Sequence, residues 1–216
     1  MLEKMSDFFE KRLSGYDEHM LSEIESATEF YPFTAAQLPM DAGCTVLDLG
    51  CGTGLELSEY FKLNSNAKIT GIDLSAGMLS ALKEKFPDKN INLICDSYFD
   101  APFGENVYDA AISVESLHHF TKEEKIPLYK KLCKALKSGG YFILTDYFAS
   151  TPEEERLHRE NFLALKKSEG IDDGEFYHYD TPLTVQNETE ALIKGGFKSV
   201  SVLSCWGNTV CLRASV

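Results

Sequence analysis

The sequence lacks any long apolar run. No stretch approaches the roughly 20 apolar residues that a membrane-spanning helix needs. The N-terminal segment MLEKMSDFFEKRL alternates charged and apolar residues and has no continuous apolar core of the kind that a signal peptide carries. We therefore expect a cytoplasmic protein with no membrane partner.

Paired cysteines and basic residues are also scarce. The six cysteines form no CxxC pair and have no histidine at metal-ligand spacing, which predicts reduced packing residues and no metal site. Lysine and arginine number 21 against 34 aspartates and glutamates, so the formal net charge is −13. Because such a surface repels phosphate backbones, we expect a small-molecule substrate and no nucleic-acid partner.

The apolar residues that are present alternate between two periodicities from residue 45 onward. Short runs at 45–49, 68–73, 91–95, 108–114 and 141–147 predict strands, and helical spacing at 55–63, 75–86, 121–136, 152–168 and 185–194 predicts helices. This alternation is typical of an α/β protein, a doubly wound parallel sheet with helices on both faces. Runs at 197–203 and 209–214 are too close together for a crossover, so they predict an antiparallel hairpin. Together these runs predict a seven-stranded, mostly parallel sheet with an antiparallel last strand.

The segment before residue 40 predicts two amphipathic helices, Leu2–Leu13 and Tyr16–Glu29, with Pro32 and Pro39 bracketing the approach to the first strand. We expect an N-terminal helical cap at 1–40 and a main domain at 41–216, with a substrate-lid insertion at about 150–183. An exposed edge strand and amphipathic helices permit either a monomer or a homodimer.

The strongest motif is Asp48-Leu49-Gly50-Cys51-Gly52-Thr53-Gly54, at the end of the first strand. Glycines at this point let the backbone turn sharply and approach a ligand closely. A dinucleotide fingerprint would need a sixth-position glycine where Leu55 stands, so a nicotinamide oxidoreductase is disfavoured. The motif instead resembles the first motif of class I S-adenosylmethionine-dependent methyltransferases, and the resemblance covers residues 45–147. It implies a Rossmann-like fold, S-adenosylmethionine as cofactor and S-adenosylhomocysteine as product.

Roles for individual residues follow from this resemblance. Asp48 is expected to reach the cofactor's ammonium, and Asp73, 23 positions after Gly50, is expected to accept from the ribose hydroxyls. Asp96 matches the acid that accepts from the adenine amine. The further cofactor-binding residues that the resemblance implies are Gly50, Cys51 and Gly52 for the amino-acid end, Leu74, Met78 and Ser97 for the base, Val114 near the sulfonium, and Tyr16 or Tyr31 over the carboxylate.

The acceptor side is less defined. His118 is a candidate general base, because an imidazole takes a proton near neutral pH; His118 or His119 can instead serve as a cap for the next helix. The aromatic segment 176–179 is either a lid over the substrate or packing against Trp206. Arg156 and Arg159 are candidates for binding a substrate carboxylate.

Methyl transfer to a small molecule by in-line displacement, with the accepting atom undetermined, is the function that the resemblance favours. A carboxy-S-adenosylmethionine synthase and a non-catalytic cofactor-binding protein stay open as alternatives.

Overall fold

The protein is built on one central sheet. The computed structural model describes residues 1–172 and 174–216, and in this part of the chain seven strands follow the order β3-β2-β1-β4-β5-β7-β6. Strands β1 to β5 run parallel, whereas β7 pairs antiparallel with both β5 and β6. The predicted fold class is confirmed. The strands are β1 (Thr45–Leu49), β2 (Lys68–Asp73), β3 (Ile91–Cys95), β4 (Tyr108–Val114), β5 (Leu136–Tyr147), β6 (Ser199–Trp206) and β7 (Thr209–Ser215).

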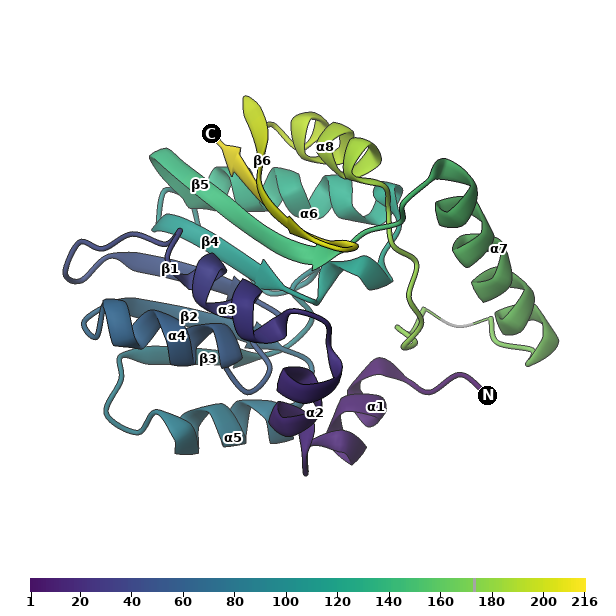
Figure 1. The fold of residues 1–216 in the computed structure, drawn as a ribbon, viewed down its shortest axis with the longest axis horizontal. Coiled ribbons are helices and arrows are strands. Elements are labelled where there is room, and N and C mark those ends of the chain that lie inside the picture. Colours follow the sequence, from purple (N-terminus) through teal and green to yellow (C-terminus); the bar gives the residue numbers. More distant parts are fainter. Residues whose placement is uncertain (173) are drawn as a thin grey trace.

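Helices cover both faces of the sheet (Figure 1). The first face is covered by α3 (Ala27–Ala35), α4 (Leu55–Leu63) and α5 (Ala76–Lys85), and the second by α6 (Lys122–Ala135) and α8 (Val185–Lys194). Alternation along the strands supplies both cores, since Phe142 and Leu144 pack with the α6 and α8 side while Ile143 packs with the α3 and α4 side. This arrangement leaves the carboxyl ends of β1, β2, β4 and β5 at one edge.

The N-terminal segment differs from the expected pair of helices. It forms α1 (Met5–Arg12), α2 (Tyr16–Glu23) and α3, because Ser26 adopts a left-handed conformation with φ 59° and interrupts the predicted second helix. Pro32 was expected to bracket the approach to the first strand but lies inside α3. Within a helix it removes a single backbone donor, and the helix continues on both sides of it. α1 lies against the start of α5, where Glu10 accepts from the Ser75 hydroxyl at 2.7 Å.

The segment after β5 projects away from the sheet as α7 (Pro152–Ser168) and returns along the N-terminal residues (Figure 1). Lys4 and Tyr177 form a β-bridge, and the Met5 amide donates to the Phe176 carbonyl at 2.9 Å. The two segments that match no motif therefore meet over the carboxyl edge of the sheet. β5 also begins at Leu136, earlier than the predicted 141, because Leu136 already pairs with Tyr108 of β4 before the register shifts and pairing continues at Tyr141.

Candidate active site

The glycine loop after β1 is held by backbone and carboxylate contacts. The Gly50 amide donates to the Ile72 carbonyl at 2.8 Å, and Asp73 accepts from the Gly52 amide at 2.9 Å and from the Ser75 amide at 2.8 Å. Gly50 and Gly52 both have positive φ, 74° and 46°. A Cβ at Gly52 would meet nothing within 4 Å, so the loop presents bare backbone to open space at this point.

A narrow cleft of about 50 Å³ lies over this loop. Seven of the predicted cofactor residues line it: Tyr16, Gly50, Gly52, Asp73, Leu74, Met78 and Val114. Asp48 and Cys51 do not line the cleft and are buried, as is Ser97. Asp96 is exposed at the next strand end, where its amide donates to the Asp73 carbonyl at 3.1 Å. The cleft thus brings together residues from the ends of β1, β2 and β4, whereas Asp96 at the end of β3 is not among the residues that line it.

Two buried carboxyls lie near the loop without a positive partner. Both Asp48 carboxylate oxygens and one Glu56 oxygen have no hydrogen-bond partner among the described residues, and both side chains are buried. Burial, reinforced by the charge of Glu56, raises the pKa of Asp48 well above its usual range. Burial also raises the pKa of Glu56 to about 7. Carboxyls of this kind are stabilised by a nearby cation, and an amino group such as the one that S-adenosylmethionine carries fits that requirement.

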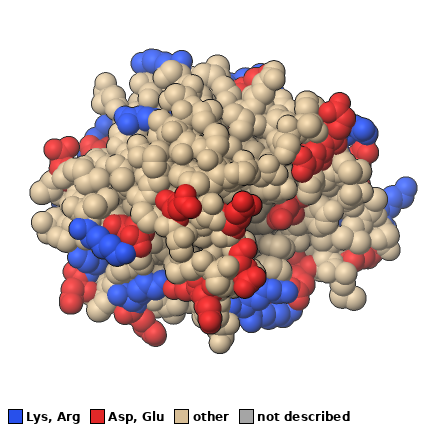
Figure 2. Space-filling view, in the orientation of Figure 1, with Lys and Arg blue, Asp and Glu red and all other residues tan. Residues whose placement is uncertain are grey.

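A larger cavity of about 970 Å³ adjoins the cleft, and Phe9, Tyr16, Glu115 and His119 line both. Aromatic and titratable side chains make up much of its remaining wall, including Phe8, Tyr147, Trp206, His118, His178 and Asp180. Figure 2 shows acidic side chains gathered around the hollow near the centre of this face.

The basic residues that line the larger cavity come from α1. Lys11 and Arg12 both contact Glu3, at 3.1 and 2.9 Å. The proposed carboxylate-binding arginines lie elsewhere, because Arg156 pairs with Glu160 and Arg159 pairs with Glu123 on the surface.

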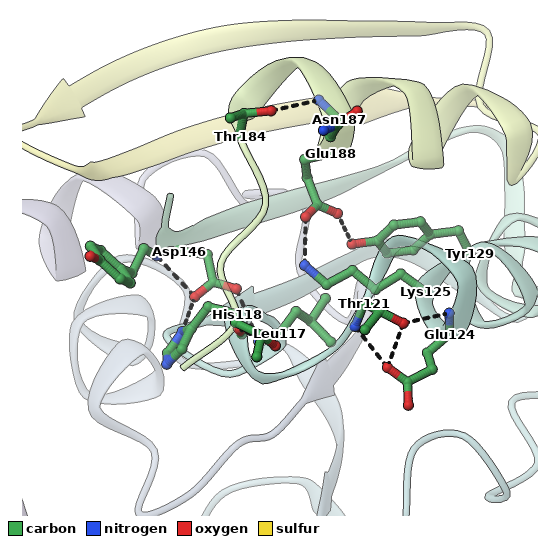
Figure 3. A network of polar contacts seen from close by, with 12 residues as sticks. Leu117, His118, Thr121, Glu124, Lys125, Tyr129, Asp146, Thr184, Asn187 and Glu188 are labelled. Atoms are coloured by element: carbon green, nitrogen blue, oxygen red, sulfur yellow. Dashed lines mark hydrogen bonds and ion pairs between the residues drawn. The ribbon is translucent and has the colours of Figure 1, made fainter. Parts of the chain in front are cut away.

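His118 lies in the short helix η1 (Leu117–His119) and contacts a buried acid from β5. Its Nδ1 is 2.5 Å from Asp146 Oδ1, and Asp146 is fixed by the Leu117 and Tyr147 amides at 2.9 and 3.0 Å (Figure 3). Burial opposes protonation of His118, but the charges of Asp146, Asp180 and Glu115 outweigh it and raise the pKa well above its usual value.

The expectation that a histidine caps the next helix is wrong. The N-terminus of α6 is closed by a capping box between Thr121 and Glu124, with the Glu124 amide donating to the Thr121 hydroxyl at 3.4 Å. Both His118 and His119 are therefore free of that role and face the larger cavity.

The aromatic segment 176–179 packs against α1 and the loops above β3 and β4. His178 stacks on Phe8 with ring centroids 3.5 Å apart, and Phe176 packs on Phe120 at 5.3 Å. Trp206 packs instead on Phe33 at 5.2 Å. Of the two alternatives for this segment, packing against Trp206 is wrong, and His178 lies at the cavity.

Two site residues escaped the sequence analysis. Asp146 ends a parallel strand, the same signal that identified Asp73, so it was detectable in the run Thr145-Asp146-Tyr147. Asp180 follows a segment with no regular periodicity, and only the tertiary fold brings it to His118 and His119.

Comparison with known proteins points to one family. Residues 46–140 match the family described as "Methyltransferase domain". The carboxy-S-adenosyl-L-methionine synthase of Campylobacter fetus is 25% identical over 96% of this chain and 93% of its own length. The tRNA (carboxymethyluridine(34)-5-O)-methyltransferase of Arabidopsis thaliana is 30% identical over 65% of this chain, which spans only 34% of that protein.

Solved structures share the fold. Human N-acetylserotonin methyltransferase, determined in complex with S-adenosylmethionine, superposes with a TM-score of 0.64 at 18% identity, over 87% of this chain and 52% of that one. No helix of residues 1–172 and 174–216 combines the length and the apolar character that crossing a membrane requires. With the glycine loop, the strand-end acids and the sheet order, these similarities identify residues 46–140 as a methyltransferase domain, on a sheet whose strand order matches the class I S-adenosylmethionine-dependent methyltransferases that the sequence resembles.

Proposed function

We propose that the protein transfers a methyl group from S-adenosylmethionine to a small molecule bound in the larger cavity. The observation that carries this proposal is the wall shared by the cleft and the cavity, because residues that line both would lie between cofactor and acceptor. The cofactor, when bound, supplies a methyl group on a sulfonium that is a good leaving group. Alignment and exclusion of water are then the main tasks of the protein.

The strand-end residues would hold the cofactor. Asp73 uses two of about four carboxylate lone-pair sites on backbone amides, which leaves two for the ribose hydroxyls. Asp48 would meet the ammonium, aided by Glu56. The adenine would lie by Leu74 and Met78, with Asp96 and Ser97 at its edge, while Gly50, Cys51, Gly52, Val114 and Tyr16 enclose the rest.

His118 is the proposed catalytic residue. Asp146 holds Nδ1, so Nε2, which faces the cavity 3.5 Å from Asp180, is the nitrogen that would take a proton from an acceptor O–H or N–H when the ring is neutral. Residues 1–40 would act as a cap and residues 150–183 as a lid. Both segments meet beside the cavity, and α1 supplies part of its wall.

The choice of a small molecule over RNA rests on charge. Some relatives are named tRNA methyltransferases, yet this chain carries a formal net charge of −13, and acidic side chains surround the hollow (Figure 2). Because the six cysteines are free thiols, we also propose a reducing, cytoplasmic location, with the protein acting as a monomer or homodimer.

A second candidate is synthesis of carboxy-S-adenosylmethionine, favoured by the match along nearly the whole of the Campylobacter fetus synthase. It would place a new carboxylate where Glu115 and Asp180 already stand. Burial raises the pKa of Glu115 to about 8, so the ionised Asp180 is the group that opposes a second negative charge in this cavity, and we favour methyl transfer. Mass spectrometry of the copurified ligand separates the two, because the carboxylated product is heavier.

The test is calorimetry with S-adenosylhomocysteine followed by transfer of a labelled methyl group. The acceptors are a panel of small amines, phenols, thiols and carboxylic acids, with bulk tRNA alongside. We expect one bound cofactor per chain and label in a small molecule. Label in tRNA alone would contradict the substrate class, binding without any transfer would indicate a cofactor-binding protein, and no binding to folded protein would overturn the proposal.

A further inference from the structure

Two histidines and an aspartate converge on the wall of the larger cavity. Asp180 Oδ1 lies 3.5 Å from His118 Nε2 and 3.2 Å from His119 Nδ1, and the Tyr179 carbonyl oxygen also lies 3.2 Å from His119 Nδ1. One atom from each of the three residues falls within a group whose members lie no more than 4.8 Å apart. The histidines come from η1 and the aspartate from the segment that precedes α8, so the cluster exists only in the folded chain.

The spacing of these atoms matches that of ligands around one metal ion. Imidazole nitrogen and carboxylate oxygen bind zinc at about 2.0–2.1 Å in tetrahedral sites, which places two ligands of the same ion roughly 3.4 Å apart. The two separations that involve Asp180, 3.2 and 3.5 Å, fall on either side of this value, and the two histidine nitrogens lie within 4.8 Å of each other. Two histidines and one carboxylate with open positions are also the ligand set of non-haem ferrous sites.

The surroundings of His118 are those of a metal ligand. Metal-bound histidines commonly donate their second ring N–H to a carboxylate, which fixes the tautomer and the ring orientation. Asp146 takes this position at Nδ1 and is itself held by two backbone amides. Nε2 is thereby the nitrogen available to an ion.

Exposure divides the cluster into a fixed part and an open part. The His118 and His119 side chains are 10% and 3% exposed, whereas that of Asp180 is 47% exposed and faces the cavity. The histidines would anchor the ion, and the cavity side would leave a position for a solvent or acceptor atom. Three protein ligands with one open position distinguish catalytic zinc sites from structural ones.

We propose that His118 Nε2, His119 Nδ1 and the Asp180 carboxylate bind one divalent transition-metal ion of the zinc or ferrous class. The inference rests on the proposed function and deepens it. The acceptor would be a small molecule that offers an oxygen or nitrogen donor to the ion, and coordination would make that donor easier to deprotonate. His118 then acts as a ligand in the metal-loaded protein, in place of a free base. No metal site was expected from the sequence, because these ligands come from segments about 60 residues apart.

The test is a titration of the chelator-treated full chain with cobalt(II), followed by competition with zinc. We expect one ion per chain and a visible absorption spectrum of a four- or five-coordinate site. Removal of a residue that hydrogen-bonds to a metal ligand typically costs roughly 10- to 100-fold in metal affinity. Loss of a ligand itself, in His119→Ala or Asp180→Asn, should therefore weaken cobalt binding by more than about 100-fold. His19→Ala is the matched control, since His19 lines the same cavity outside the cluster. This variant should bind the ion as tightly as the wild type does.

Calorimetry with S-adenosylhomocysteine on the same samples separates the two proposals. Unchanged cofactor affinity in the two ligand variants shows that they fold and retain the cofactor site. If the wild type binds cobalt no more tightly than His119→Ala while the cofactor still binds, the metal inference is overturned and the proposed function stands. Should a ligand variant fail to fold, the wild-type spectrum decides alone, and a six-coordinate aquo-ion spectrum overturns the inference.

Discussion

Replacing Asp73 with asparagine tests the cofactor site with little change in side-chain volume. The carboxylate accepts from the Gly52 and Ser75 amides and is proposed to accept from two ribose hydroxyls as well. Asparagine keeps one accepting oxygen, and its NH₂ group can only donate. The Gly52 amide donates to Oδ2 and the Ser75 amide to Oδ1, so an NH₂ group in place of either oxygen removes one backbone contact. It also removes the ribose contact that we assign to the same oxygen.

The magnitude follows from the value of such contacts. A hydrogen bond to a charged group contributes about 1.5–3 kcal/mol. Loss of one ribose bond should therefore weaken S-adenosylhomocysteine binding roughly 10- to 150-fold. Loss of one hydrogen bond from a backbone amide should lower the free energy of unfolding by about 1.5–3 kcal/mol as well. Alanine is a poorer choice, because it would strand both amides and mix the two effects.

Calorimetry with S-adenosylhomocysteine and urea unfolding measure the two quantities separately. Asp100→Asn is the matched control, since Asp100 is exposed beyond the β3 strand end and carries the same charge change. It should leave both quantities near the wild-type values. If Asp73→Asn lowers stability while the affinity stays within threefold of wild type, Asp73 serves the loop alone and the ribose assignment is wrong.

Three further changes test the fold around the site. Gly50→Ala forces a side chain into positive φ with its Cβ 2.0 Å from Ser116 Oγ, so thermal unfolding should show a loss of at least ~1–2 kcal/mol; an unchanged melting temperature would refute the close approach. Glu188→Ala leaves Lys125, 2.6 Å away and 1% exposed, buried without its partner (Figure 3). Urea unfolding should show a loss of about 3–5 kcal/mol. Because Glu188 also accepts from the buried Tyr129 hydroxyl, the triple variant Lys125→Met/Tyr129→Phe/Glu188→Leu should largely restore stability, and no restoration would contradict a charge penalty. Burial raises the pKa of Glu56 from 4.5 to about 7, so its contribution is fully present below pH 4.5 and is lost as pH rises toward 7, by up to about 3 kcal/mol. Glu56→Gln should flatten this decline in urea midpoints between pH 5 and 8, and equal slopes in the two proteins would contradict it.

The core elements were predictable because each is specified by local pattern. The predicted bounds of β1 to β4 agree with the structure, as does the N-cap at Ser75, which accepts from the Met78 amide at 3.1 Å. The N-terminal helices were less predictable, since Pro32 predicts a break by local rules but lies inside a helix whose residues Phe30 and Tyr31 are buried. Tertiary packing decides such cases.

The site divides in the same way. Asp73 and the glycine loop could be placed because the carboxyl ends of parallel strands must share one edge. Asp180 could not, because its position depends on how the segment after α7 returns across α1. The aromatic residues at 176–179 predicted a lid or a packing surface. Sequence periodicity could not predict which other aromatic rings they would contact.

The edge of the sheet collects more carboxylates than its own cations can balance. Burial alone penalises each ionised group, and a chain selected only for stability would replace them with apolar residues of similar volume. The acids with buried carboxyl groups are Asp48, Glu56, Asp73, Glu115 and Asp146, and the partly exposed Asp180 lies beside His118 and His119. A cofactor with an ammonium and a sulfonium, together with a divalent ion between the histidines, supplies positive charge at both ends of this row. On this reasoning each ligand should stabilise the fold in proportion to its own binding, by RT ln(1 + [L]/Kd). With both ligands bound, the increase in the free energy of unfolding should exceed the sum of the increases that each ligand gives alone. The reason is that each ligand lowers the cost of ionising the carboxylates that face the other.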